Sequence, residues 1–389
     1  NDYVPPSVGF YSTTAFTDYA VKCIKEHKRV SPFFLYLSYP APHWPLQAPS
    51  KAIAAYKGKY DKGWDEMRKA RFERMKKMGL ANEEWELSPR DSFVQPWSEN
   101  VPDKAWELAN METYAAMTTL MDKGIGRVVD ALEAKGQLEN TVIFYLQDNG
   151  ACAEELDWIK KRPNSEDIVA LALDDVQTEM IPFTSREGKP VKIMKEGWPG
   201  PADGYTAYGL NWANASNTPF REYKHWVHEG GIATPLIVHW PAKIKKGGEL
   251  RKNPAHLIDI MATCMDISGQ QYPASYNGNT IYPMEGTSLV PAMEGNDLER
   301  EAIYWEHEGN RAVRMGKWKL ISKASKKNSY LWDKTAELEL KDWELFDMEK
   351  DRTEMHDIAA TNPEMVKTMA QMWLEWGKRT GIIPRPSKK

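Results

Sequence analysis

Three runs of apolar and aromatic residues constrain the fold of this 389-residue chain more than any other feature. They occupy residues 33–39, 141–147 and 233–239, and each has the length of a β-strand. The first run is almost continuously hydrophobic, which is typical of a strand buried on both faces in a parallel sheet. Apolar residues at helical spacing predict helices over 15–27 and 105–135. We therefore predict an α/β fold with a mixed, mostly parallel sheet flanked by helices.

The sequence changes character after residue 302. Short apolar segments separated by tight turns replace the longer strands and helices, and a last helix begins at Asn362, with proline at its first helical position. This pattern predicts a small antiparallel sheet with one helix. We place the main α/β domain at residues 1–285 and the C-terminal α+β subdomain at residues 286–389.

Composition excludes several classes of protein. Lys and Arg number 51 against 55 Asp and Glu, so the net charge of −4 provides no basic field for general nucleic-acid binding. No apolar run approaches the ~18–20 residues of a membrane span. The three cysteines, Cys23, Cys152 and Cys264, are too few for a disulfide framework or for a zinc site made of cysteines.

Polar residues directly follow two of the predicted strands. The first strand leads into the turn that contains His43, and the second leads into Asp148-Asn149-Gly150. Ligands of α/β proteins bind beyond the carboxyl ends of the strands. A carboxylate and an amide oxygen at that place suit a hard cation. Taken alone, however, the triplet is more simply explained as a turn, because Asn-Gly is a common turn dipeptide.

A basic segment precedes the third predicted strand. It contains Arg221, Lys224, His225 and His228, and it ends in Gly230-Gly231. A lysine can act as a point-charge partner for an oxyanion such as sulfate or phosphate. A solvated charged loop would have the same composition, so the segment by itself identifies no ligand.

Five ordered stretches resemble a type I sulfatase, and within that family the bacterial arylsulfatases of the alkaline-phosphatase superfamily. They are PFFLYLSYPAPHWPLQAP, YKGKYDKGWDEMRKARFERMKKMGL, TVIFYLQDNGACAEE, YGLNWANASNTPFREYKHWVHEGGIATPLIVHWP and WELFDMEKDRTEMHDIA. The likeness extends from about residue 10 to residue 380, in the order of the family. It implies the alkaline-phosphatase/sulfatase fold and a hydrolase that cleaves sulfate esters, either aryl sulfates or sulfated carbohydrates.

The resemblance also implies roles for individual residues. His43, in the PHWP turn, is expected to contact the sulfate ester or to protonate the leaving oxygen. Lys224, which precedes the Glu-Gly-Gly signature, is expected to bind a sulfate oxygen. His228 and Arg221 lie near Lys224 in the sequence and are candidates for substrate binding.

The metal and the nucleophile of the family follow from the same resemblance. Asp148 and Asn149 are expected to ligate Ca²⁺. The attacking group of these enzymes is a formylglycine, made from the Cys or Ser of a Cys/Ser-x-Pro-x-Arg motif, and the 389 residues contain no such motif. The early Asp-Asp metal pair of the family is absent as well. We therefore expect that the chain lacks the N-terminal third of the family and is catalytically incomplete without it.

Two other interpretations stay open at this point. A phosphodiesterase or phosphonate hydrolase of the same superfamily shares much of the metal-site geometry, and an incomplete fragment or homologue could bind sulfated glycans without turnover. The sequence does not identify the substrate, because specificity is expected from the loops at 51–104 and 152–217. Family members are commonly periplasmic or secreted, and this location is carried over as an expectation.

Overall fold

A computed structural model describes residues 9–28, 31–156, 169–172, 175–323 and 343–383. The chain divides into two compact units that alternate along the sequence. Unit 1 comprises Asn1–Arg71, Arg90–Leu138 and Cys152–Ser216, and unit 2 comprises Phe72–Pro89, Glu139–Ala151 and Asn217–Lys389. The predicted domain boundary at residue 285 stays a prediction.

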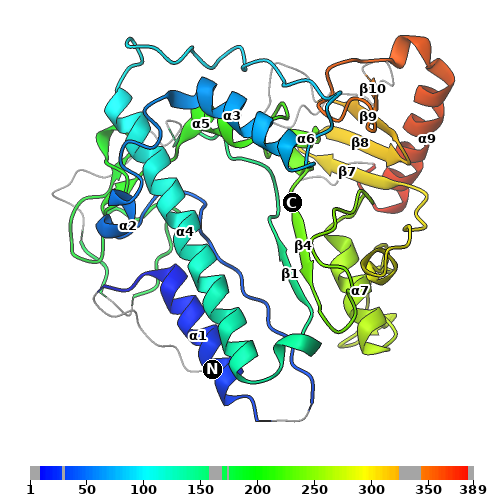
Figure 1. Cartoon of the computed structure of the whole chain (residues 1–389), viewed down its shortest axis with the longest axis horizontal. Helices are drawn as coiled ribbons and strands as arrows, with labels where there is room; N and C mark the ends of the chain where they lie inside the picture. Colours follow the sequence, from blue (N-terminus) through cyan, green and yellow to red (C-terminus); the bar gives the residue numbers. More distant parts are fainter. Residues whose placement is uncertain (1–8, 29–30, 157–168, 173–174, 324–342, 384–389) are drawn as a thin grey trace. The chain divides into compact units, whose positions relative to one another are not determined.

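Two long helices that pack side by side form the frame of unit 1. They are α1 (Ser12–Glu26) and α4 (Lys104–Ala134) (Figure 1). Helix α1 buries Ala20 and Ile24, and a Cβ on Gly124 of α4 would lie only 2.4 Å from Thr17 Oγ1 of α1. The small residue therefore permits the close approach of the two helices. Both helices agree with the ranges predicted from apolar spacing.

The remaining elements of unit 1 are short. Two short parallel strands contribute to a hydrophobic core in which Trp106, Leu156 and Tyr205 are buried. Helix α3 (Gly63–Lys77) passes from unit 1 into unit 2 at residue 72. The short elements are α2 (Ser50–Ala54), β2 (Lys192–Ile193), η4 (Met194–Glu196), β3 (Gly204–Tyr205) and α5 (Gly209–Ser216).

Unit 2 contains two of the three strands predicted for the main sheet. Strand β1 (Ile143–Leu146) pairs antiparallel with β4 (Leu236–His239), so that Ile143 lies opposite His239. The other elements before the C-terminal sheet are short, apart from one longer helix, and the first of them begins at Leu138, the last residue of a unit 1 segment. They are η1 (Leu138–Asn140), α6 (Glu229–Ile232), α7 (Ile258–Ser268), β5 (Ser275–Tyr276), β6 (Asn279–Thr280) and α8 (Val290–Met293).

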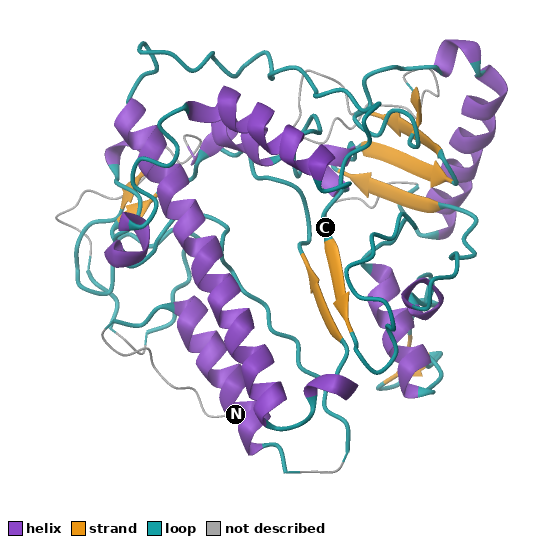
Figure 2. Ribbon diagram, in the orientation of Figure 1, coloured by secondary structure: helices purple, strands orange, loops and turns teal. Residues whose placement is uncertain are grey.

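The C-terminal part of unit 2 is a four-stranded antiparallel sheet with one helix, as predicted (Figure 2). The elements are β7 (Ile303–His307), β8 (Asn310–Met315), β9 (Trp318–Ser322), β10 (Glu344–Asp347), η5 (Ala359–Thr361) and α9 (Pro363–Arg379). The strands follow the order β10-β9-β8-β7, and helix α9 packs against β8 and β9 through the buried side chains of Met369 and Trp373.

The prediction of a buried strand at residues 33–39 is wrong. The segment forms no strand, and Phe34 and Tyr36 are 79% and 80% exposed. A strand needs a neighbouring backbone to pair with its N–H and C=O groups, and the hydrophobicity of a segment does not report whether that neighbour exists.

None of the helices in the described part of the chain combines the length and the apolar character that a membrane span requires.

Candidate functional site

The Asp148-Asn149-Gly150 turn of unit 2 lies directly against the segment that ends in Gly230-Gly231. The Gly150 N–H donates to the Gly231 carbonyl at 2.9 Å. The Lys224 N–H donates to the carbonyl of Ala151 at 3.1 Å. The side chain of Asn217 joins the two segments, because it accepts from Ala151 N–H at 2.8 Å and donates to the Gly230 carbonyl at 2.6 Å. Backbone pairing therefore holds the two motifs together.

Glycine is required where these segments meet. A Cβ on Gly150 would lie 1.7 Å from the Gly230 carbonyl oxygen. A Cβ on Gly230 would lie 2.1 Å from the carbonyl oxygen of Arg221, and one on Gly231 would lie 1.9 Å from that of Trp226. A larger residue at Gly150 would push the two motifs apart, and one at Gly230 or Gly231 would distort the fold of the 221–231 segment itself.

A cavity of about 430 Å³ opens beside this junction within unit 2. Its lining includes Asp148, Asn149, Lys224, His225, His307 and Glu308. The structure thus brings together the acid, the amide and the lysine that the sequence singled out. Their roles toward a ligand stay predictions.

The donor atoms of Asp148 and Asn149 suit a hard cation. The amide nitrogen of Asn149 donates to the Gly150 carbonyl at 2.8 Å, so the amide oxygen is the atom that a cation would contact. Together with the carboxylate of Asp148 it offers two oxygens of the kind that calcium prefers. Because calcium takes ~6–8 oxygens, these two residues would form part of a coordination shell.

Sequence reasoning missed the hairpin residues that line the same cavity. His307 ends β7 and Glu308 follows it in the turn, and the carboxylate of Glu308 lies 3.1 Å from Nδ1 of His225. The imidazole rings of His225 and His307 stack with their centroids 5.9 Å apart. The side chain of Asn310 fixes this contact, because it donates to the carbonyl oxygens of His225 and His307. A turn sequence gives no signal of such a tertiary contact.

The structure places Arg221 and His228 against Glu344, and neither residue lines the cavity. His228 is fully buried, and its Nε2 lies 3.4 Å from the carboxylate of Glu344. Burial lowers the pKa of His228 to about 4, so its imidazole is neutral at pH 7. Substrate contact by these two residues therefore stays a prediction, whereas their contact with Glu344 is observed.

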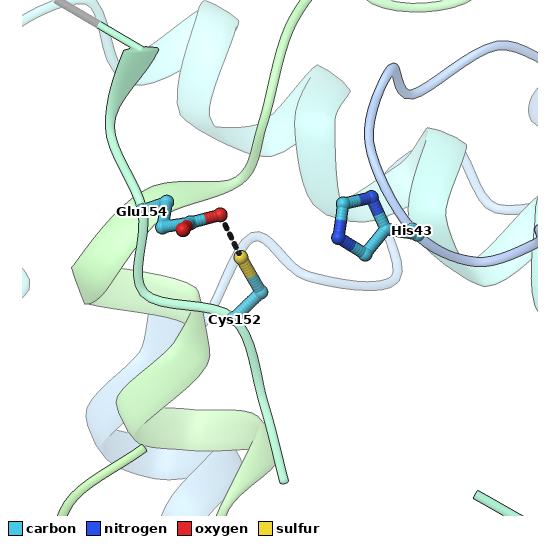
Figure 3. Close-up of side chains that lie close together, drawn as sticks. All are labelled: His43, Cys152 and Glu154. Carbon is cyan, nitrogen blue, oxygen red and sulfur yellow. Dashed lines mark hydrogen bonds between the residues drawn. The ribbon is translucent and has the colours of Figure 1, made fainter. Parts of the chain in front are cut away.

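His43 belongs to unit 1, where its neighbours are Trp44, Cys152 and Glu154. Its Nδ1 donates to the backbone carbonyl of Trp44 at 2.8 Å. Ligand atoms of His43, Cys152 and Glu154 lie within 4.8 Å of one another (Figure 3). Because His43 is in unit 1 and Lys224 is in unit 2, the predicted convergence of the two side chains on one substrate stays a prediction.

Unit 1 also contains a cavity of about 650 Å³ that the sequence did not indicate. Its lining includes Glu107 of α4 together with Glu155, Lys195 and Asn211. Burial raises the pKa of Glu107 to about 7, although the hydrogen bond from Asn211 opposes this effect. In the sequence Glu107 looks like one more acidic residue on a helix, because nothing in the helical pattern reveals that this position faces a cavity.

Two family models match the chain. The model described as Sulfatase matches residues 1–270, and the model described as N-sulphoglucosamine sulphohydrolase, C-terminal, matches residues 221–379. An uncharacterized sulfatase of Schizosaccharomyces pombe is 30% identical over 385 residues, which are 97% of this chain and 63% of the relative. The arylsulfatase of Klebsiella aerogenes is 29% identical over 282 residues, which are 72% of this chain and 55% of the relative. The chain therefore spans less than two thirds of the length of these relatives.

Solved structures agree with the predicted fold class. The structure of Ps i-CgsB in complex with k-i-k-neocarrahexaose has a TM-score of 0.56 and 22% identity, and the match covers 94% of this chain and 55% of that one. A second protein, solved with its substrate D-glucosamine-2-N,6-O-disulfate, has a TM-score of 0.54 and 18% identity over 97% of this chain and 72% of that one. At these identities the likeness shows the fold alone.

Proposed function

Because the chain belongs to the sulfatase family, we propose that it acts in the hydrolysis of sulfate esters. The observation that supports this most directly is the cavity of unit 2, whose lining includes Asp148, Asn149 and Lys224. A sulfate ester is anionic, and its hydrolysis requires fixed positive charge next to the reacting group. A lysine beside two ligands for a divalent cation meets this requirement.

Each of these residues has a defined role in the proposal. Lys224 binds a sulfate oxygen as a point charge. Asp148 and Asn149 hold Ca²⁺, which when bound supplies further positive charge to the sulfate group. His43 protonates the leaving oxygen. Its Nδ1–H is engaged by the Trp44 carbonyl, so Nε2 is the atom that transfers the proton.

The nucleophile in this proposal is a formylglycine that the 389 residues do not encode. None of the three cysteines lies in a Cys-x-Pro-x-Arg sequence, and no serine begins the corresponding pattern. We therefore propose that the formylglycine comes from a separate segment that contains the Cys/Ser-x-Pro-x-Arg motif. The absence of the N-terminal third of the family stays a prediction, and the activity assay described below tests whether the chain needs that segment.

A sulfated sugar or an aryl sulfate is the proposed substrate class. Support comes from the arylsulfatase of Klebsiella aerogenes and from the structurally similar protein whose substrate is D-glucosamine-2-N,6-O-disulfate. A periplasmic or secreted location is part of the same proposal, by analogy with the family.

The decisive experiment compares two proteins in the presence of calcium. One is this chain, and the other is this chain joined to a segment in which the Cys or Ser of Cys/Ser-x-Pro-x-Arg has been oxidised to formylglycine. We expect turnover of an aryl sulfate by the second protein only, and a loss of at least ~100-fold in kcat when Lys224 is replaced by alanine. The matched control is Lys252→Ala, which changes an exposed lysine of the same unit.

Three outcomes would contradict the proposal. Turnover by the chain alone would show that the nucleophile assignment is wrong. Equal losses of kcat in Lys224→Ala and Lys252→Ala would show that Lys224 does not belong to the site. A strong preference for an aryl phosphonate monoester over the aryl sulfate would favour the phosphonate hydrolases of the superfamily.

A further inference from the structure

Three side chains of unit 1 form a cluster whose chemistry goes beyond the proposed function. His43 lies in the turn that follows residues 33–39, and Cys152 and Glu154 are alternate residues of a segment distant from it in sequence. Each offers one ligand atom, and these atoms lie within 4.8 Å of one another (Figure 3). An imidazole, a thiol and a carboxylate therefore share one small volume.

Hydrogen bonds orient the members of this cluster. Nδ1 of His43 donates to the Trp44 carbonyl at 2.8 Å, and Figure 3 shows the other ring nitrogen on the side of Cys152 and Glu154. The indole N–H of Trp44 donates to Oε2 of Glu154 at 3.0 Å. The thiol of Cys152 donates to the same oxygen at 3.2 Å. Trp44 thus holds both the imidazole and the carboxylate in place.

This arrangement has the features of a zinc site. Zinc binds cysteine sulfur, histidine nitrogen and carboxylate oxygen at ~2.0–2.3 Å, and three protein ligands leave a fourth position for water. A histidine ligand usually donates its second ring N–H to a carbonyl or carboxylate, as His43 does here. Calcium prefers oxygen ligands, so the thiol and the imidazole select against it. We propose that His43, Cys152 and Glu154 bind Zn²⁺.

Zinc binding changes the protonation of the cluster. The thiol of Cys152 loses its proton to the solvent, and the bond from its sulfur to zinc replaces the hydrogen bond to Glu154. The lone pair on Nε2 of His43 is used for the metal, so that atom no longer carries a transferable proton. Zinc would therefore inhibit sulfate-ester hydrolysis. This consequence rests on the proposed function, whereas zinc binding itself does not.

Cobalt(II) is a suitable probe, because a cobalt–thiolate bond has a charge-transfer absorption that nitrogen and oxygen ligands do not produce. The chain is titrated with Co²⁺, and Zn²⁺ is then added to displace it. We expect one equivalent of cobalt with a thiolate band, and no band in Cys152→Ser. His43→Gln and Glu154→Gln should weaken binding by more than ~10-fold, since even the loss of an outer-shell partner costs ~10–100-fold.

The chain provides matched controls. Cys264→Ser should keep the thiolate band. His225, His307 and Glu308 form the other metal-ligand cluster of the described residues, and it contains no cysteine. His307→Gln should therefore leave the band unchanged.

A thiolate band that persists in Cys152→Ser, or that disappears in Cys264→Ser, overturns the proposal, as does the absence of any band in the folded native chain. Circular dichroism checks that the variants fold. If Cys152→Ser does not fold, alkylation of the native chain replaces it: zinc should slow the modification of Cys152 but not of the exposed Cys23, and equal slowing or no slowing overturns the site. A zinc site without sulfatase activity in the motif-carrying protein would contradict the proposed function alone.

Discussion

The carboxyl group of Glu107 shows how a single residue can depart from its ordinary chemistry. It is buried on α4, where Oε1 accepts from the amide of Asn211 at 3.3 Å and Oε2 has no hydrogen-bond partner among the described residues. Removal from water disfavours the charged form, which is why the pKa of Glu107 rises to about 7. A buried acid with this pKa beside a cavity is a candidate for function as well as a cost in stability.

Glu107→Gln tests this environment through stability. The pKa rises from 4.5 to about 7 on folding, so the folded chain holds a proton that the unfolded chain releases, and stability falls as the pH rises through this window. We expect the variant to melt at a higher temperature than the native chain at pH 8 and to differ much less at pH 5, with a change of up to about 3 kcal/mol. The control Glu133→Gln, exposed near the end of the same helix, should have the same effect at both pH values. A shift in Glu107→Gln that does not depend on pH would contradict the burial argument.

His228 makes stability depend on pH in the opposite direction. Burial lowers its pKa from 6.5 to about 4, so its contribution is complete above pH 6.5 and is lost as the pH falls toward 4. Urea unfolding at pH 7 and at pH 4.5 should show that His228→Gln loses less stability on acidification than the native chain, by up to about 3 kcal/mol. His239→Gln, which changes an exposed histidine of β4, should show no such difference. An unchanged acid response with a raised KM in the motif-carrying protein would instead support the predicted contact with substrate.

At the scale of elements, local pattern predicts what local forces determine. Helices α1 and α4 follow from apolar spacing, and strands β1 and β4 follow from short hydrophobic runs bounded by turns. The segment 33–39 has the same kind of sequence but no pairing partner among the described residues, so its composition alone misleads. The position of His307 beside His225 could not be predicted from the sequence either. It depends on the side chain of Asn310, which donates hydrogen bonds to the carbonyl oxygens of His225 and His307, two residues far apart in the sequence.

Strand β9 is connected to helix α6 by buried charges. The ammonium of Lys319 lies 2.8 Å from carboxylate oxygens of both Glu229 and Glu354, and all three side chains are buried. A further ion pair joins Glu229 to Arg352 at 2.8 Å. Although burial opposes it, the charges of Lys319 and Arg352 hold the pKa of Glu229 below its ordinary value. The helix that follows the Lys224 segment is thus held by electrostatics and not by apolar packing alone.

Lys319→Met should destabilise the chain by ~3–5 kcal/mol, because it leaves two buried carboxylates without their shared cation. Urea unfolding at pH 7 measures the change. Lys317→Met is the matched control on the neighbouring turn. Its partner is Asp347 at 3.2 Å and its side chain is 41% exposed, so it should cost less than ~1 kcal/mol. Similar losses of unfolding free energy in the two variants would show that the buried ion pairs stabilise the chain no more than the exposed one does.

At the scale of the whole molecule, the predicted site residues are distributed over both units. Asp148, Asn149 and Lys224 line one cavity of unit 2, whereas His43 lies with Cys152 and Glu154 in unit 1. The boundary between the units falls just after Ala151, so the segment that begins with Asp148 continues from one unit into the other. Motif order in the sequence indicates which residues belong together, but it contains no distances between remote segments, and the meeting of His43 with Lys224 requires a test in solution.

A double-mutant cycle provides that test. In the protein that carries the nucleophile motif, kcat/KM for an aryl sulfate is measured for His43→Ala, Lys224→Ala and the double variant, and each ratio is converted to a free energy. Two side chains that act on the same sulfate group should couple by ~0.5–3 kcal/mol, so the double variant should lose less than the sum of the single losses. The pair His43→Ala and Lys252→Ala should be additive within ~0.5 kcal/mol, since Lys252 is an exposed residue outside the site. Additive losses for His43 and Lys224 would mean that the two residues act independently, and the proposal of one active site containing both would then be wrong.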